Sequence, residues 1–144
     1  MNPKTRILVV EDEPGLSALI SEVLEEEGCS VVAARDGREA VDILEGQMFD
    51  LVLTDINMPR MTGLELLEWM RAAGRGEKVM TMTASSGYED LEAEGYPQVA
   101  AQFRKPFRLP QLVDAVEQVA FCWAPESCGA SPELGERSAR AHAL

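Results

Sequence analysis

A short apolar run that ends in an acid, Leu51-Val52-Leu53-Thr54-Asp55, lies near the middle of the sequence. An ionisable group at the end of a buried strand is costly to desolvate unless it has a partner or a function. A second run, Ile7-Leu8-Val9-Val10, ends in the same way, in Glu11-Asp12-Glu13. Because ligands bind at the carboxyl ends of parallel strands, these two runs predict a carboxylate cluster at one edge of a sheet.

Apolar runs alternate with helical patterns along the whole chain, and five of the runs resemble strands. They are residues 6–10, 30–34, 50–54, 78–83 and 100–103. Between them, apolar residues recur at the spacing of amphipathic helices. Pro14 suits the first turn of the first helix and Gly28 its end, while Asp36-Gly37-Arg38-Glu39 is typical of a capping box that opens the second.

Two more helices are marked by Gly63, which precedes the third, and by Pro110 in the first turn of the last. Residues 85–98 contain Gly87, Gly95 and Pro97, which leave room for only a short or irregular helix. Repeated strand–helix alternation implies parallel pairing, right-handed crossovers and helices on both sheet faces. The expected fold class is therefore α/β, an open, doubly wound, five-stranded parallel sheet.

The alternating pattern stops after about Phe121. We expect residues 1–122 to form one domain and residues 123–144, rich in proline, glycine, serine and alanine, to form a disordered tail. A chain of 144 residues has the length of a single domain. No DNA-binding or enzymatic domain is therefore expected to follow.

The overall charge and composition exclude several classes of protein. A net charge of −12 disfavours binding to nucleic acid or to an anionic membrane, because both would repel the chain. No stretch approaches the roughly 18 apolar residues that cross a bilayer, and a signal peptide is not expected at the N-terminus. Three cysteines without C-x-x-C spacing favour reduced thiols, and hence a cytoplasmic location.

The clustered acids Glu11, Asp12 and Asp55 indicate a cation site. Two carboxylates about 4 Å apart repel by roughly 4 kcal/mol at an effective dielectric constant of 20. Hard oxygen ligands with open positions suit Mg²⁺, which favours phosphate-bearing partners. A free oxygen of Asp55 would then be a nucleophile that takes a phosphoryl group as an aspartyl-phosphate. Taken alone, Glu11-Asp12-Glu13 is more typical of a solvated helix start, and only the other motifs favour the cation site.

A phosphoryl acceptor also needs groups that neutralise and hydrogen-bond the phosphoryl oxygens. Thr83 ends the fourth strand-like run, and Lys105 follows the fifth. Because the ends of neighbouring parallel strands converge, Asp55, Thr83 and Lys105 are expected to meet at one edge.

Four segments, in this order, resemble the receiver domain of two-component response regulators, the CheY-like family. They are residues 9–14, 55–63, 82–84 and 103–107, and the resemblance spans residues 5 to about 121. Each segment alone is a weak signal, but all four at these intervals are specific. The resemblance implies the flavodoxin/CheY-like strand order 2-1-3-4-5.

The resemblance also implies a role for each matching residue. Asp55 would be the phospho-acceptor. Asp12 and Asp55 would bind Mg²⁺ directly, Glu11 through water, and Asn57 through its backbone carbonyl. Thr83 would hold a phosphoryl oxygen and move towards it on activation, and Lys105 would pair with the phosphate.

Further expectations follow from the family. The Lys105–Pro106 peptide would be cis, which proline makes accessible, and Asn57 and Ser85 would tune the dephosphorylation rate. The phosphoryl donor would be a sensor histidine kinase or a histidine phosphotransfer protein, and an unidentified target protein would receive the signal. One position departs from the pattern, because Gln102 stands where the family usually carries the Tyr or Phe of its conformational switch.

These expectations define a stand-alone receiver that signals by phosphorylation-dependent protein contact, and an intermediate in a phosphorelay is equally consistent. Gln102 leaves open a second class, a pseudo-receiver that binds partners without phosphorylation. A third class, a Mg²⁺-dependent phosphatase of the haloacid-dehalogenase type, is disfavoured because Asp55-Ile56-Asn57 lacks the second acid of the D-x-D motif.

Overall fold

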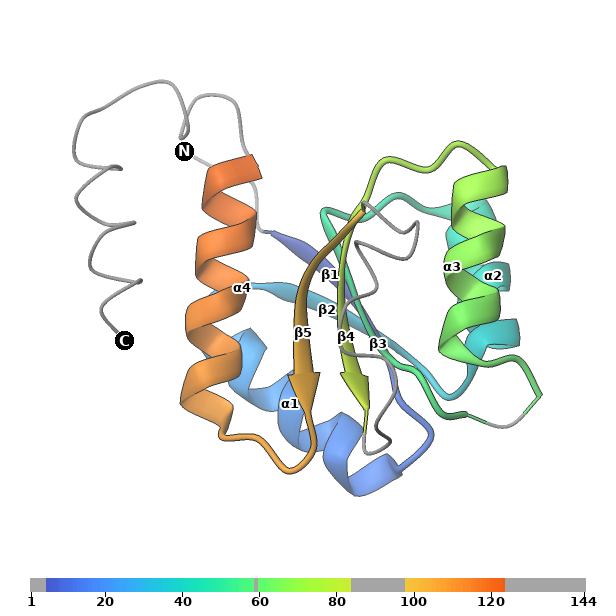
Figure 1. The fold of residues 1–144 in the computed structure, drawn as a ribbon. Coiled ribbons are helices and arrows are strands. Elements are labelled where there is room, and N and C mark those ends of the chain that lie inside the picture. Colours follow the sequence, from blue (N-terminus) through green and yellow to red (C-terminus); the bar gives the residue numbers. More distant parts are fainter. Residues whose placement is uncertain (1–4, 59, 84–97, 124–144) are drawn as a thin grey trace. The chain divides into compact units, whose positions relative to one another are not determined.

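Five parallel strands form one sheet, in a computed structural model that describes residues 5–58, 60–83 and 98–123. The strands are β1 Arg6–Val10, β2 Ser30–Ala34, β3 Leu51–Asp55, β4 Lys78–Thr83 and β5 Val99–Arg104. Their order in the sheet is β2-β1-β3-β4-β5 (Figure 1). Both the parallel α/β sheet and the order 2-1-3-4-5 are therefore confirmed.

The strand register aligns the carboxyl ends of the central strands. Val10 of β1 pairs with Thr54 of β3, and Asp55 of β3 pairs with Met82 of β4. Thr83, the next residue of β4, pairs with Arg104 of β5. Residues 11, 55, 83 and 105 are consequently brought to a single edge of the sheet by backbone pairing alone.

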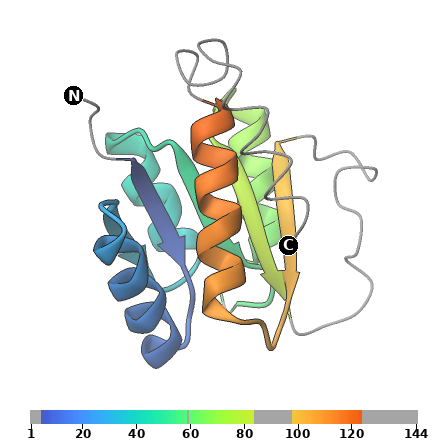
Figure 2. The same cartoon turned by 90° about the vertical axis from the view of Figure 1, so that its left-hand side faces the viewer.

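Three helices pack on this sheet: α1 Pro14–Glu26, α2 Gly37–Gly46 and α3 Gly63–Ala72. α1 contacts β1 and β2, whereas α2 contacts these strands and α3. Figures 1 and 2 show α1 on one face of the sheet, with α2 and α3 together on the other.

Side chains along the strands alternate between these two faces. Leu8, Val10 and Val52 join the hydrophobic core formed with α2 and α3. Their neighbours Ile7 and Leu53 are fully buried as well. This two-sided burial explains why β1 and β3 are continuous apolar runs, as expected for central parallel strands.

The helix ends follow the sequence signals in part. α1 begins at Pro14, and Gly28 has the positive φ (96°) that glycine tolerates at a helix end. The capping box expected at α2 is wrong in its second half. The Asp36 side chain accepts a hydrogen bond from the Glu39 N–H, but the Glu39 carboxylate accepts from the Arg35 N–H. The complete capping box lies at α3, where Thr62 and Glu65 bond reciprocally.

Strand bounds also differ slightly from expectation. β3 spans Leu51–Asp55, one residue later than expected at each end, and the Asp50 carboxylate accepts a hydrogen bond from the Arg6 N–H just before the strand. β5 extends one residue beyond the expected run at each end.

The chain divides after Phe107, and the second unit contains α4 Leu109–Trp123, with Pro110 as its second residue. Its expected position in the first turn is confirmed. The expected irregular helix of residues 85–98 and the tail lie almost wholly outside the described residues. Within the described part of the chain, no helix is long and apolar enough to cross a membrane.

Candidate functional site

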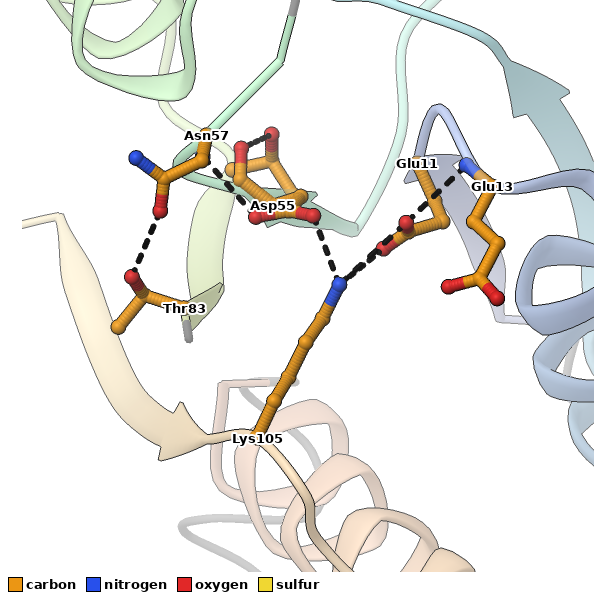
Figure 3. Close-up of polar contacts among 7 residues, drawn as sticks. Glu11, Glu13, Asp55, Asn57, Thr83 and Lys105 are labelled. Carbon is orange, nitrogen blue, oxygen red and sulfur yellow. Dashed lines mark hydrogen bonds and ion pairs between the residues drawn. The ribbon is translucent and has the colours of Figure 1, made fainter. Parts of the chain in front are cut away.

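Polar side chains from the ends of β1, β3, β4 and β5 converge at the carboxyl edge of the sheet. Figure 3 shows Glu11, Asp55 and Lys105 pointing toward one another, with Asn57 and Thr83 beside them. Glu11 and Asp55 are almost completely buried, and Thr83 is buried as well. Asp12 and Asn57 lie at the solvent-exposed rim.

The Lys105 ammonium links two carboxylates that belong to different strands. Its Nζ atom lies 2.8 Å from Asp55 Oδ2 and 3.1 Å from Glu11 Oε1. The Lys105 backbone N–H donates to the Thr83 carbonyl at 2.8 Å, which holds the residue at the end of β5. The Lys105–Pro106 peptide is cis, as the resemblance implied.

This crowding of charges shifts two pKa values. Burial, together with repulsion from Asp55, raises the pKa of Glu11 to about 7, although Lys105 opposes the shift. Burial alone would lower the pKa of Lys105, but hydrogen bonds to Asp55 and Glu11 outweigh it and raise the pKa. Lys105 therefore stays charged near neutral pH, whereas Glu11 titrates there.

The stability of the metal-free protein should consequently depend on Glu11. Because the folded-state pKa exceeds the unfolded value of 4.5, the folded state holds a proton that the unfolded chain releases. The stabilisation is complete below about pH 4.5 and is lost as the pH rises through about 7. Relative to Glu11→Gln, the wild-type free energy of unfolding should fall by on the order of 3 kcal/mol across this window.

Urea unfolding at several pH values, in buffer with a chelator, measures this difference. Glu13→Gln is the matched control, since it removes the same charge from an exposed neighbouring residue. A difference between wild type and Glu11→Gln that does not change with pH would contradict the assignment of the titrating group.

The acidic residues could also hold a divalent cation. Glu11, Asp12 and Asp55 each offer a carboxylate oxygen, and these atoms lie within 4.8 Å of one another. Oxygen donors at this separation, with exposed Asp12 open to water, fit the chemistry of a hard cation. The contact between Lys105 and Glu11 is a direct bond that the sequence did not predict.

Asn57 connects Asp55 to Thr83 through hydrogen bonds. The Asn57 N–H donates to Asp55 Oδ1 at 3.0 Å, and Asn57 Oδ1 accepts from the Thr83 hydroxyl at 3.0 Å. Asp55, Asn57 and Thr83 therefore form a continuous chain of hydrogen bonds, and Asp55 is contacted on one side by Asn57 and on the other by Lys105.

Gly63 holds the loop after Asp55 close to the strand. A Cβ atom on Gly63 would lie 2.3 Å from the Asp55 carbonyl oxygen and 2.8 Å from Ile56 Cα. The Gly63 N–H donates to the Ile56 carbonyl at 2.9 Å. The sequence predicts this glycine only as a helix boundary. No local sequence signal distinguishes a glycine at a helix boundary from a glycine that is required because another stretch of backbone leaves no room for a Cβ atom.

All six residues selected from the sequence thus lie in one neighbourhood: Glu11, Asp12, Asp55, Asn57, Thr83 and Lys105. Ser85 lies outside the described residues. Gln102 is partly buried and pairs in register with Thr81, whose buried hydroxyl has no hydrogen-bond partner among the described residues. Phe103 instead packs its ring 5.6 Å from that of Phe107.

Comparisons with known proteins agree with this geometry. The family model described as "Response regulator receiver domain" matches residues 7–117. The sporulation initiation phosphotransferase F of Bacillus subtilis is 34% identical over 118 residues, covering 82% of this chain and 94% of that protein. The probable transcriptional regulatory protein TcrX of Mycobacterium tuberculosis is 35% identical over 74% of this chain, which spans only 46% of TcrX.

Solved structures are similar as well. The response regulator TrrA of Thermotoga maritima, in complex with Mg²⁺ and BeF, has a TM-score of 0.70 and 34% identity, covering 80% of this chain and 98% of that one. The chemotaxis response regulator CheY4 of Vibrio cholerae has a TM-score of 0.72 and 27% identity, covering 81% and 99%. Sequence and fold therefore point to the same family.

Proposed function

Because this chain belongs to the response regulator receiver domain family, which accepts phosphoryl groups, we propose that Asp55 is the residue that becomes phosphorylated. The observation that carries the proposal is the 2.8 Å contact between the Lys105 ammonium and Asp55 Oδ2 in a buried acidic pocket. An ammonium so placed orients the carboxylate and can neutralise a phosphoryl group bound to it.

In the proposed reaction, an oxygen of Asp55 attacks the phosphorus of a phosphohistidine on a partner protein. The new O–P bond forms as the P–N bond breaks, and the imidazole leaves with the electron pair. Lys105 and the Thr83 hydroxyl then contact phosphoryl oxygens, which requires Thr83 to exchange its bond to Asn57. Positioning and charge neutralisation are the main contributions of a protein to this chemistry.

The metal proposed for the site is Mg²⁺. Glu11, Asp12 and Asp55 would hold it, Glu11 through water, together with the backbone carbonyl of Asn57. When bound, Mg²⁺ would neutralise charge on the phosphoryl oxygens and reduce repulsion between the carboxylates. The hard oxygen donors of these three acids support this choice.

The proposed donor is a sensor histidine kinase or a histidine phosphotransfer protein, and the proposed output is contact with an unidentified protein in the cytoplasm. Self-catalysed phosphotransfer and slow autodephosphorylation are part of the proposal. We also propose residues 1–122 as the receiver and residues 123–144 as a tail. Similarity to a protein named as a phosphotransferase favours a phosphorelay intermediate as a second candidate.

Incubation with acetyl phosphate and Mg²⁺ tests the acceptor function directly. Intact-protein mass spectrometry should show the addition of one phosphoryl group, and a chelator should prevent it. Absence of any mass gain, in protein that binds Mg²⁺, would contradict phosphorylation and favour the pseudo-receiver.

Lys105→Ala should make the stability of the protein strongly dependent on Mg²⁺. Without the ammonium, Glu11 and Asp55 remain as buried acids with no cation between them. Removing one partner of a buried ion pair costs about 3 kcal/mol. A metal ion would then restore more stability to the variant than to the wild type.

Urea unfolding with and without Mg²⁺ measures both effects. Lys78→Ala is the control, because Lys78 begins β4 and lies at the opposite end of the strand from Thr83. If Mg²⁺ stabilised Lys105→Ala and wild type equally, the ammonium and the metal would not share the same carboxylates.

A further inference from the structure

An ion pair joins the loop after Asp55 to the start of α2. Arg60 Nε lies 2.9 Å from Asp36 Oδ2, and Arg60 Nη2 lies 3.2 Å from Asp36 Oδ1. Both carboxylate oxygens are therefore used, in the two-pronged geometry that gives arginine pairs their directionality. The Asp36 side chain is only 10% exposed, although that of Arg60 is 60% exposed.

Asp36 is a rigid anchor for this pair. It is the N-cap of α2, and its Oδ1 atom accepts the Glu39 N–H at 2.9 Å. The hydrogen bond from Arg60 holds the pKa of Asp36 below its ordinary value, so the carboxylate remains ionised near neutral pH. The guanidinium thus binds a charge whose position is set by a helix.

The backbone beside Arg60 is held against the same helix. The Gly37 N–H donates to the Met61 carbonyl at 3.1 Å, and a Cβ on Gly37 would lie 2.7 Å from that oxygen. Arg60 itself has φ of 64°, in the left-handed region that a non-glycine residue adopts only when its surroundings enforce it. The loop therefore has a constrained conformation at Arg60 and Met61.

The same loop carries Asn57 at its other end, where the Asn57 N–H and side chain contact Asp55 and Thr83. We propose that Arg60 is a positioning residue, which, by binding Asp36, holds the loop in the conformation that places Asn57 for cation binding. This inference rests on the proposed function, since it assigns to Arg60 a part in the Mg²⁺ affinity of that site.

Electrostatics and positioning predict opposite effects of removing Arg60. Loss of a positive charge from the same domain should by itself strengthen Mg²⁺ binding, if it has any effect at all. Loss of a group that orders the metal-binding loop should weaken it. Arg60→Ala therefore separates the two explanations by the sign of the change, and Arg60→Lys removes the two-pronged geometry without changing the charge.

Isothermal titration calorimetry with MgCl₂ provides the test on the full-length protein. The Mg²⁺ dissociation constant should rise about tenfold in Arg60→Ala, the lower end of the usual effect of removing a residue that supports a metal ligand, and by a smaller factor in Arg60→Lys. The double variant Arg60→Ala/Asp36→Asn, in which asparagine preserves the helix cap, should bind no more weakly than Arg60→Ala alone, because the two residues act as one unit.

Arg71→Ala is the matched control, since it removes one positive charge from an exposed pair with Glu68 on α3. The Mg²⁺ dissociation constant of Arg71→Ala should stay within about twofold of the wild-type value. An unchanged or lower dissociation constant in Arg60→Ala would overturn the inference, as would an unchanged constant in Arg60→Lys if Arg60→Ala fails to fold.

Failure of the inference differs from failure of the proposed function. If wild type accepts a phosphoryl group and binds Mg²⁺ with the same affinity as the Arg60 variants, only the role of Arg60 is wrong. If wild type binds no Mg²⁺ and gains no mass with acetyl phosphate, both are wrong.

Discussion

Asp55→Asn should abolish phosphoryl acceptance and leave the fold intact. The carboxamide keeps the size of the side chain and can still accept the Asn57 N–H, but it offers no anionic oxygen to attack phosphorus. We expect the rate of phosphorylation by acetyl phosphate to fall at least about 1000-fold, equivalent to about 4 kcal/mol in the barrier. Time-resolved mass spectrometry of the intact protein measures this rate.

A second measurement on Asp55→Asn tests how the Asp55 charge affects the pKa of Glu11. Repulsion from Asp55 contributes to the raised pKa of Glu11, so its removal should lower that pKa. The pH dependence of unfolding between about pH 4.5 and pH 7 should therefore weaken in Asp55→Asn.

Asp50→Asn is the control for both measurements. Asp50 lies at the amino end of β3, where its carboxylate accepts the Arg6 N–H, and asparagine can make the same bond. This variant should be phosphorylated at the wild-type rate. Phosphorylation of Asp55→Asn at that rate would show that another residue is the acceptor.

Among the glycines that the structure describes, Gly63 should be the one whose replacement by alanine destabilises the protein most. The added Cβ would lie 2.3 Å from the Asp55 carbonyl oxygen, far inside van der Waals contact, and the obstacle is backbone that cannot rotate away. Forcing the loop from the strand should cost about 3 kcal/mol or more of unfolding free energy. Urea unfolding followed by circular dichroism measures the change.

Gly15→Ala is the matched control, because nothing lies within 4 Å of the Cβ position at this early residue of α1. Alanine favours helix over glycine, so this variant should be as stable as wild type or more stable, by up to about 1 kcal/mol. Equal stability of the two variants would mean that the loop relaxes around the new methyl group. Because the blocked carbonyl belongs to Asp55, Gly63→Ala should also slow phosphorylation.

The order of elements was predictable because it depends on local patterns. Continuous apolar runs identified β1 and β3, which are buried on both faces, and Pro14 marked the first residue of α1. The prediction was wrong where one side chain can bond either of two neighbouring backbone N–H groups. Glu39 bonds the Arg35 N–H in place of its expected partner, a choice between neighbouring donors that spacing alone does not decide.

The positions of the candidate site residues were also predictable from the sequence. Strand ends placed Asp55, Thr83 and Lys105 at one edge, since parallel pairing aligns those ends regardless of which residues occupy them. The roles of these residues came from the resemblance to a family. Gly63 was underestimated, because only the distance to the Asp55 carbonyl distinguishes it from an ordinary helix boundary.

The sequence by itself therefore determined the elements, the sheet class and the set of polar residues at its carboxyl edge, because periodicity and spacing are properties of the chain alone. Tertiary structure decided how those residues are paired: Lys105 with both Glu11 and Asp55, Thr83 with Asn57, and Arg60 with Asp36. These pairs join residues 24 to 94 positions apart. Such contacts depend on distances between elements, which no local pattern contains.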